Sequence, residues 1–330
     1  MAQPGRRAKL EVTDVSDSMA SARPASISEG RRGVSRGLGY GACAVAGIFW
    51  STGFFLGKIA FQRLSVDHFV LYRFLFACAG LLFVVERPRF SGSQWRLLLI
   101  ASFLGIPVQF LVQFYGLHLT TVSHAALMVG TMPVILAVGA TMFSGEHLDR
   151  KGWLALAGST LGIVLIISST SRHVTGGGNL LGDLLVIAAM FFSLAWILLN
   201  QRLMREGHSP MAVTVWGILT GTVMLAIWVL ARSGLPPVHG IGGKIWLAVA
   251  ASGLLCTAAA TLLWNWGIHH VPASRAGVFL NIEPALGAVL GVELLGDRLG
   301  LGTWIGGALI IAAAVVLTTT EKQEPEVLVG

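Results

Sequence analysis

The stretch WGIHHVPASRAGVFLNIEPALGAVLGVELLGDRLGLGTW (266–304) decides the fold, because it repeats an earlier stretch of the same chain without a gap. The earlier copy reads YGLHLTTVSHAALMVGTMPVILAVGATMFSGEHLDRKGW (115–153) and lies at a constant offset of 151 residues. Histidine, proline and tryptophan positions coincide over the 39 residues, as in the pairs His118 and His269, and Pro133 and Pro284. Composition alone does not explain such matches, so we infer an internal repeat.

Both copies lie in a strongly apolar chain. Of its 330 residues 54% are hydrophobic and only 12% are charged, and the mean hydropathy is +0.74. A soluble domain usually has about 25% charged residues. Ten apolar runs approach the roughly 17 to 25 residues that a helix needs to cross a bilayer. We expect these spans near 40–60, 67–85, 96–117, 123–144, 153–169, 181–201, 212–231, 244–264, 273–295 and 302–320.

The fold class follows from combining the repeat with the spans. Each copy has five spans, and because five is odd the two copies enter the membrane with opposite orientations. We therefore predict an all-α integral membrane protein with ten transmembrane helices, built as two inverted five-helix repeats at 38–170 and 171–320. The polar, Ser- and Arg-rich segment 1–37 is expected to be a disordered tail, and 321–330 a second tail. Inverted repeats are typical of secondary transporters.

Lysine and arginine residues predict the orientation, because positively charged loops stay in the cytoplasm. With the N-terminus inside, the cytoplasmic segments hold 16 of these residues and the other side holds five. Both termini should thus be cytoplasmic, in a multi-pass protein of the cytoplasmic (inner) membrane. No cleaved export signal is visible before the first span.

Several function classes are disfavoured. The net charge of +7 comes largely from the tail and short loops, so nucleic-acid binding is not indicated. The three cysteines lie in apolar segments without metal-ligand spacing, and no cofactor or metal is expected. The chain lacks HExxH and GxSxG motifs, so we expect no enzyme, although an intramembrane enzyme and a channel-like uniporter remain alternative classes.

Glu283 stands out inside the ninth span. A carboxylate there costs about 2 to 3 kcal/mol on insertion scales unless it is neutral, paired or hydrated. Its counterpart in the first copy is Met132, so the shared scaffold does not require an acid. We expect Pro133 and Pro284 to break their helices and Glu283 to bind a proton or a substrate ammonium group. Alternatively, Glu283 pins two helices through Asn281 or a hydroxyl group.

Two cations also fall within spans. Lys58 and Arg73 lie on neighbouring helices near one membrane face, where either could extend its charge to the interface. The functional alternative is charge pairing or gating, with Arg73 binding a carboxylate in bidentate fashion.

Other polar and aromatic residues could line a substrate cavity. Gln109 and Gln113 are four residues apart and share one helical face, and two amides in lipid would be costly. Further candidates of this kind, which packing could equally explain, are Trp50, Ser51, Tyr115, Trp196, Asn200, Trp264 and Asn265.

Several of these segments carry a family likeness. SHAALMVGTMPVILAVGATMFSGEHL, its echo SRAGVFLNIEPALGAVLGVELLGDRL, FWSTGFFLGKIA (49–60) and LYRFLFACAGLLF (71–83) resemble the EamA family of the drug/metabolite transporter superfamily. That family often has a lysine at the position of Lys58 and an arginine at that of Arg73. The resemblance covers about 38–320 and implies a ten-helix carrier for small metabolites such as amino acids, working by proton exchange or facilitated diffusion.

Together the repeat and the resemblance predict a secondary transporter that exports an amino acid or a related compound by alternating access, with proton coupling and oligomeric state left open. The expected partners are a small-molecule substrate, protons if transport is coupled, and the lipid bilayer.

Overall fold

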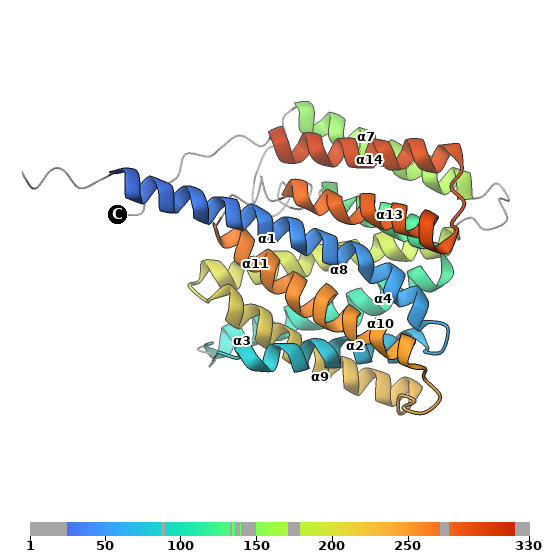
Figure 1. Cartoon of the computed structure of the whole chain (residues 1–330), viewed down its shortest axis with the longest axis horizontal. Coiled ribbons are helices and arrows are strands. Elements are labelled where there is room, and N and C mark those ends of the chain that lie inside the picture. The colour runs from blue at the N-terminus through green and yellow to red at the C-terminus, as the bar shows by residue number, and fades with distance from the viewer. Residues whose placement is uncertain are drawn as a thin grey trace, which may run out of the picture.

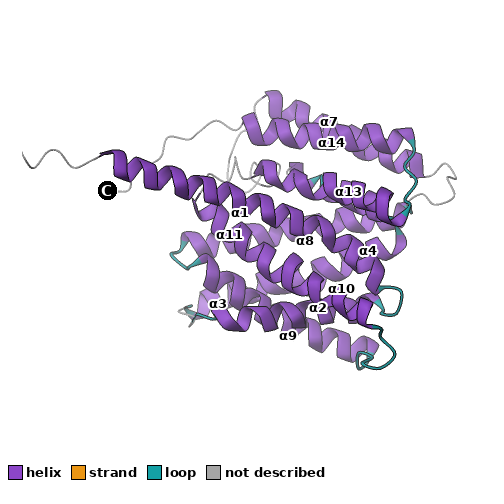
Figure 2. Ribbon diagram, in the orientation of Figure 1, coloured by secondary structure: helices purple, strands orange, loops and turns teal. Residues whose placement is uncertain are grey.

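The computed structural model describes residues 25–86, 90–132, 134–135, 139, 150–170, 179–270 and 277–320. Within these ranges the chain forms helices joined by short loops and no strand (Figure 2). The predicted all-α fold class is therefore confirmed.

Six stretches of the described chain are long and apolar enough to cross a membrane. They are Gly37–Ala60 in α1 (Ala25–Ala60), Val66–Val84 including α2 (Val66–Leu81), Gly92–Leu119 formed by α3 (Gly92–Phe103) and α4 (Gln109–Leu119), Leu180–Arg205 in α8, Pro210–Ser233 in α9, and Gly243–Ile268 formed by α10 (Gly243–Gly253) and α11 (Ala260–His270). Each overlaps a span predicted from the sequence.

The remaining helices are α5 (Val122–Val129), α7 (Arg150–Thr170), α13 (Ile282–Leu295) and α14 (Leu301–Thr320). The helices α7 and α14 lie side by side at one edge of the bundle, while α13 packs between α1 and α5 (Figure 1). Parts of the predicted spans 123–144 and 273–295 lie outside the described residues, so the count of ten spans stays a prediction.

The start of α1 differs from the expectation. The helix begins at Ala25, within the segment predicted to be a tail up to residue 37, and its first turns extend beyond the bundle (Figure 1). Adding a turn to an existing helix is far easier than nucleating one, so a polar segment can continue a membrane helix even though it lacks an apolar face of its own. Residues 1–24 and the second predicted tail lie outside the described range.

Two long helices contain a π-helical segment at matching places. In α3 and α4 it spans Leu104–Val108, and in α10 and α11 it spans Leu254–Ala259. The first contains Pro107, which lacks an N–H donor and so favours a local change of hydrogen bonding. The two sequence copies are 151 residues apart, and shifting the first π-helical segment by this offset places it almost on the second one.

Close glycine crossings also occur in matching pairs. A Cβ atom built on Gly116 of α4 would lie 2.7 Å from the carbonyl oxygen of Gly182 in α8. A Cβ atom on Gly267 of α11 would lie 2.9 Å from the carbonyl oxygen of Gly39 in α1. Gly116 and Gly267 occupy equivalent positions of the two sequence copies, so α4 crosses α8 as α11 crosses α1.

The core between α1, α2 and α4 is aromatic. Phe69 and Phe114 are almost fully buried, and their ring centroids lie 5.0 Å apart in an edge-to-face arrangement. Phe54 and Phe61 of the α1 region pack against the same ring of Phe114. These rings fix the spacing of the three helices that surround the site described below.

The crossing of α7 and α14 depends on backbone contact at Gly162 and Gly306. A Cβ atom on either glycine would lie 2.5 Å from the carbonyl oxygen of the other, whereas a Cβ atom on Gly158 would lie 4.0 Å from its nearest neighbour, Ala313. We expect Gly162→Ala to lower the free energy of unfolding by roughly 1 to 3 kcal/mol through overpacking.

Gly158→Ala in the same helix is the matched control and should unfold at or slightly above the wild-type temperature. Thermal unfolding in detergent, followed by circular dichroism, compares the two variants. Equal melting temperatures for both would contradict this account of the crossing.

Candidate functional site

Arg73 is buried near the centre of the bundle. It lies in α2 with 4% of its surface exposed. Its Nε donates a hydrogen bond to Oγ1 of Thr257 at 2.7 Å, and Nη2 donates one to the carbonyl oxygen of Cys256 at 3.3 Å. Both acceptors belong to the π-helical segment Leu254–Ala259, a kind of segment that is frequent at functional sites.

Two aromatic rings complete the surroundings of this guanidinium group. Its central carbon lies 5.1 Å from the ring centroids of both Phe110 and Phe114 in α4. Such contacts are worth about 2 kcal/mol or more when the cation is desolvated. Among the described residues no carboxylate oxygen lies within 4 Å of the guanidinium nitrogens, and Nη1 donates to no group there. The buried charge of Arg73 thus has no direct counter-ion in the described part.

Glu283, the acid of the ninth predicted span, forms no ion pair with Arg73 within 4 Å. It is half-buried in the first turn of α13, which begins directly after a short 3-10 helix, Gly277–Asn281. Pro284 lies in this first turn, where its missing N–H would have no intrahelical partner in any case. The α-helix therefore begins within the predicted span, and the positive end of its dipole favours the carboxylate of Glu283.

The two glutamines of α4 are buried as well, each with 6% exposure. Oε1 of Gln109 is enclosed and accepts no hydrogen bond from the described residues, and the same holds for Oδ1 of Asn200. A buried polar atom without a partner costs about 1 to 3 kcal/mol. Gln109 and Gln113 each precede a phenylalanine that packs on Arg73, which places the amides on the adjoining face of α4.

Other predicted residues of the site contact residues other than Arg73 and Glu283. Trp50 and Trp264 pack with ring centroids 5.5 Å apart, joining α1 to α11. The hydroxyl of Ser51 donates to the carbonyl of Ile48, one turn earlier in α1. Trp196 is half-buried against Gly105, while Asn281 is buried at the start of α13. Pro133 lies outside the described residues.

Tyr115 and Lys58 lie near one end of the bundle. The hydroxyl of Tyr115 donates to Oδ1 of Asp67 at 2.7 Å, at the start of α2. Nζ of Lys58 donates to the carbonyl oxygen of Thr120 at 2.6 Å, so the ammonium group caps the C-terminus of α4. A cation in this position complements the negative end of the helix dipole.

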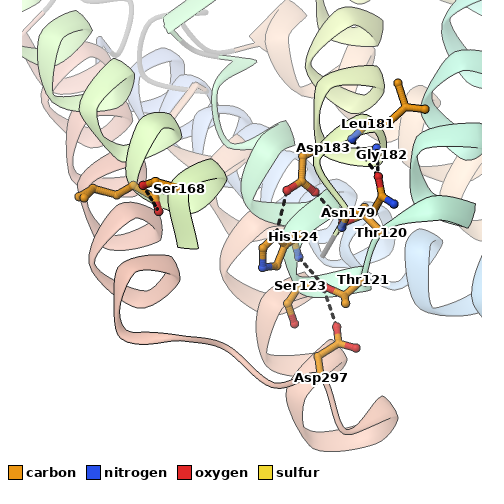
Figure 3. Close-up of polar contacts among 11 residues, drawn as sticks. Thr120, Thr121, Ser123, His124, Ser168, Asn179, Leu181, Gly182, Asp183 and Asp297 are labelled. Carbon is orange, nitrogen blue, oxygen red and sulfur yellow. Dashed lines mark hydrogen bonds and ion pairs between the residues drawn. The ribbon is translucent and has the colours of Figure 1, made fainter. Parts of the chain in front are cut away.

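The same end contains a polar cluster in which Lys58 was a predicted residue, whereas the buried Thr120, His124 and Asp183 were not predicted from the sequence. It consists of Lys58, Thr120, His124, Asp183 and Asp297, which we call the Asp183 cluster. Figure 3 shows Thr120, His124, Asp183 and Asp297. Asp183, fully buried in the first turn of α8, accepts from Oγ1 of Thr120 at 2.6 Å and pairs with Nδ1 of His124 at 3.0 Å. Asp297 belongs to the cluster through Ser123, which precedes His124 in the chain.

Asp297 also connects two distant parts of the chain. Its carboxylate accepts a hydrogen bond from the backbone N–H of Ser123 at 2.9 Å, near the N-terminus of α5 (Figure 3). The sequence did contain a signal for this cluster, because Asp183 is an acid inside a predicted span, as Glu283 is. Its pairing with His124, 59 residues away, was not visible in the local pattern.

The opposite end of the bundle has polar contacts of a different kind. Glu86 accepts hydrogen bonds from Ser209 at 2.7 Å and from Trp216 at 2.8 Å, while Gln94 donates to Glu206 at 3.0 Å. We call these five residues the Glu86 cluster. The hydrogen bond from Gln94 lowers the pKa of Glu206 below its ordinary value, and both carboxylates are exposed.

Arg73 is thus buried among helices from distant parts of the chain, and polar clusters connect such parts at each end of the bundle. The EamA-like transporter family model matches residues 37–168 and again residues 180–319, so the chain belongs to this family and is a multi-pass membrane transporter.

Relatives of known sequence agree with the family. An uncharacterized transporter of Archaeoglobus fulgidus is 26% identical over 287 residues, covering 85% of this chain and 97% of the relative. The uncharacterized transporter YyaM of Bacillus subtilis is 23% identical over 273 residues, covering 80% and 88%. A solved crystal structure has a TM-score of 0.60 at 18% identity, over 88% of this chain and 99% of that one, and therefore supports the fold alone.

The Asp183 cluster should contribute strongly to stability. Replacing Asp183 with alanine removes the acceptor of the buried Thr120 hydroxyl and breaks the buried pair with His124, and should lower the free energy of unfolding by roughly 3 kcal/mol. Glu206→Gln at the exposed end is the control and should leave the melting temperature unchanged. Thermal unfolding in detergent tests this difference, and a wild-type melting temperature for Asp183→Ala would contradict it.

Proposed function

We propose that the protein is a secondary transporter that exports a small metabolite, an amino acid or a related compound, across the cytoplasmic membrane by alternating access. The observation that carries the proposal is the buried guanidinium group of Arg73, which has no carboxylate within 4 Å in the described part of the chain. A buried charge without an ion-pair partner is costly, and binding an anionic group of the substrate would offset that cost.

The side chains of Arg73 and Glu283 indicate the class of substrate. Arg73 can bind a carboxylate through two parallel N–H donors. Glu283, in the first turn of α13, can bind an ammonium group or a proton. An amino acid carries both groups, and the buried amide of Gln109 offers a further polar contact.

The proposal includes the architecture of ten helices in two inverted five-helix repeats, at 38–170 and 171–320. Three observations support it: the family model matches twice, the glycine crossings occur in equivalent pairs, and so do the two π-helical segments. The distribution of lysine and arginine favours cytoplasmic termini.

The Asp183 cluster would seal the non-cytoplasmic end in this conformation. Thr120, His124 and Lys58 lie in the first family match, whereas Asp183 and Asp297 lie in the second. Movement of one half against the other must break the hydrogen bonds between them. The exposed Glu86 cluster likewise joins the two halves at the cytoplasmic end and would open in the alternate phase.

A facilitative uniporter is the second candidate within the same family. In that case Glu283 holds the start of α13 in place and takes no part in coupling. The two candidates differ in whether substrate flux moves protons, which makes them separable by experiment. An intramembrane enzyme is disfavoured by the family membership.

We expect Glu283→Gln to abolish substrate-driven proton movement, because the amide cannot exchange a proton. The purified protein in liposomes, loaded with a pH-sensitive dye, is tested against the twenty proteinogenic amino acids and related metabolites. Glu293→Gln is the matched control, since this acid lies exposed on the same helix and should leave the signal intact.

Two other results would change the conclusion. Flux of labelled substrate without any pH signal, equal in wild type and Glu283→Gln, would establish the uniporter and give Glu283 a structural role. Absence of flux for every compound in the panel would contradict the proposed substrate class.

A further inference from the structure

A groove with a volume of about 230 Å³ lies between α13 and α14, which are neighbours in the bundle (Figure 1). Leu127 of α5 forms part of its floor. One wall contains Ala285 and Val289 of α13, and the other contains Trp304 and Ala308 of α14. Val289, Trp304 and Ala308 are exposed, so the groove is open along the side of the bundle. In a membrane protein this side faces the hydrocarbon of the bilayer.

Close packing against α5 explains why the two walls stay apart. A Cβ atom on Gly287 of α13 would lie 2.6 Å from Cβ of Ala126, and one on Gly307 of α14 would lie 2.8 Å from Cδ2 of Leu127. Two consecutive residues of α5 therefore contact the two neighbouring helices and separate their inner faces. Further out, the walls carry mainly small side chains, which leave the space between them unfilled.

The groove has the length of one leaflet of the bilayer. Its part on α14 extends from Thr303 to Ile311, which is about 12 Å at 1.5 Å per residue. The hydrocarbon core is about 30 Å thick, so one leaflet contributes about 15 Å. Since α14 begins at Leu301, four residues after Asp297, the groove lies in the leaflet on the side of the Asp183 cluster. Trp304 lies near this end of α14, as is typical of tryptophan at a membrane interface.

We propose that this groove binds one acyl chain of a phospholipid from that leaflet. Eight of its ten lining residues are alanine, glycine, valine, leucine or isoleucine, and Thr303 is almost fully buried. Such walls offer few hydrogen-bond partners to water, and apolar cavities of this size stay dry and take up apolar molecules. The inference goes beyond the proposed function, because it depends on the position of the protein in the membrane and not on its substrate.

The dimensions of the groove fit a single hydrocarbon chain. A chain one carbon atom thick, with carbon contacts at about 3.5 to 4.0 Å, fills roughly 200 Å³ over a length of about 12 Å. This volume is close to the 230 Å³ of the groove. A helix with its side chains is at least about 10 Å across and would need roughly 900 Å³ over the same length. An acyl chain can therefore enter the groove, whereas a helix of a second copy of the protein cannot.

The test measures whether a lipid chain reaches Leu127, which is only 4% exposed and lies on the floor of the groove. Leu161 of α7 is the reference for lipid around the bundle, because it is 52% exposed and precedes Gly162, which crosses α14 at Gly306. The full-length protein is reconstituted in liposomes of phosphatidylethanolamine and phosphatidylglycerol, with a small share of phosphatidylethanolamine that carries a diazirine in the middle of one acyl chain. After illumination, peptide mass spectrometry gives the ratio of label on Leu127 to label on Leu161.

We expect Leu127 to be labelled in the wild type. Ala308→Leu and Ala285→Leu, which fill the groove from opposite walls, should each lower the ratio by about fivefold or more, because the added carbon atoms occupy the space of the chain. Ala312→Leu is the matched control and should leave the ratio unchanged, since this exposed alanine lies one turn after Ala308 but outside the groove. Melting temperatures in detergent at or above that of the wild type show that the variants fold.

Three outcomes would overturn the inference: a wild type labelled on Leu161 but not on Leu127, an unchanged ratio in both groove variants, or an equal loss in Ala312→Leu. Label on Leu127 that appears only when the protein is strongly diluted in lipid would assign the groove to side chains of a second copy and would overturn it as well. The labelling needs neither substrate nor a pH gradient. Its result is therefore independent of the transport measurements that test the proposed function.

Discussion

Burial of the Arg73 guanidinium is the constraint on which the centre of the bundle depends. Removing such a charge from water costs several kcal/mol even after the protein relaxes. The surroundings offset this cost with one hydroxyl, one carbonyl and two aromatic faces, which come from α4 and from the π-helical segment Leu254–Ala259. Three helices from distant parts of the sequence must therefore meet closely at this point.

Small residues make that approach possible. Gly253, at the end of α10, lies against the carbonyl oxygen of Arg73, and any side chain there would push α10 away from α2. The π-helical segment begins at the next residue and brings Cys256 and Thr257 to the guanidinium group. The glycines at Gly116, Gly267 and Gly162 act in the same way at the helix crossings further out.

Much of the fold could be predicted because hydrophobic length and repeated glycine and proline positions are properties of local sequence. Eight of the predicted spans correspond closely to described helices or helix pairs, as Val66–Val84 does to 67–85. The start of α1 was misplaced because helix extension into a polar segment leaves no apolar pattern. The π-helical segments were also not visible, since an extra residue within a helical turn changes backbone bonding and not composition.

The site was predictable only in part, because local sequence shows which residues are charged but not which distant residues they contact. A charged residue within an apolar span is visible in the sequence, and Arg73 and Glu283 were predicted as site residues for this reason. Whether a polar residue lines a cavity or is held by a neighbour depends on distant contacts, as between Tyr115 and Asp67, 48 residues apart. The pairing of His124 with Asp183, 59 residues apart, is of the same kind.

The contrast in burial between the two polar clusters has a consequence for the response of the protein to its medium. Dissolved ions screen exposed charges over about 8 Å at physiological ionic strength but reach buried pairs far less. The ion pair that Arg202 forms with Glu206 of the Glu86 cluster is open to such screening, whereas Asp183 is fully enclosed. Raising the ionic strength therefore weakens the ion pair between Arg202 and Glu206 and leaves the pair between His124 and Asp183 almost unchanged.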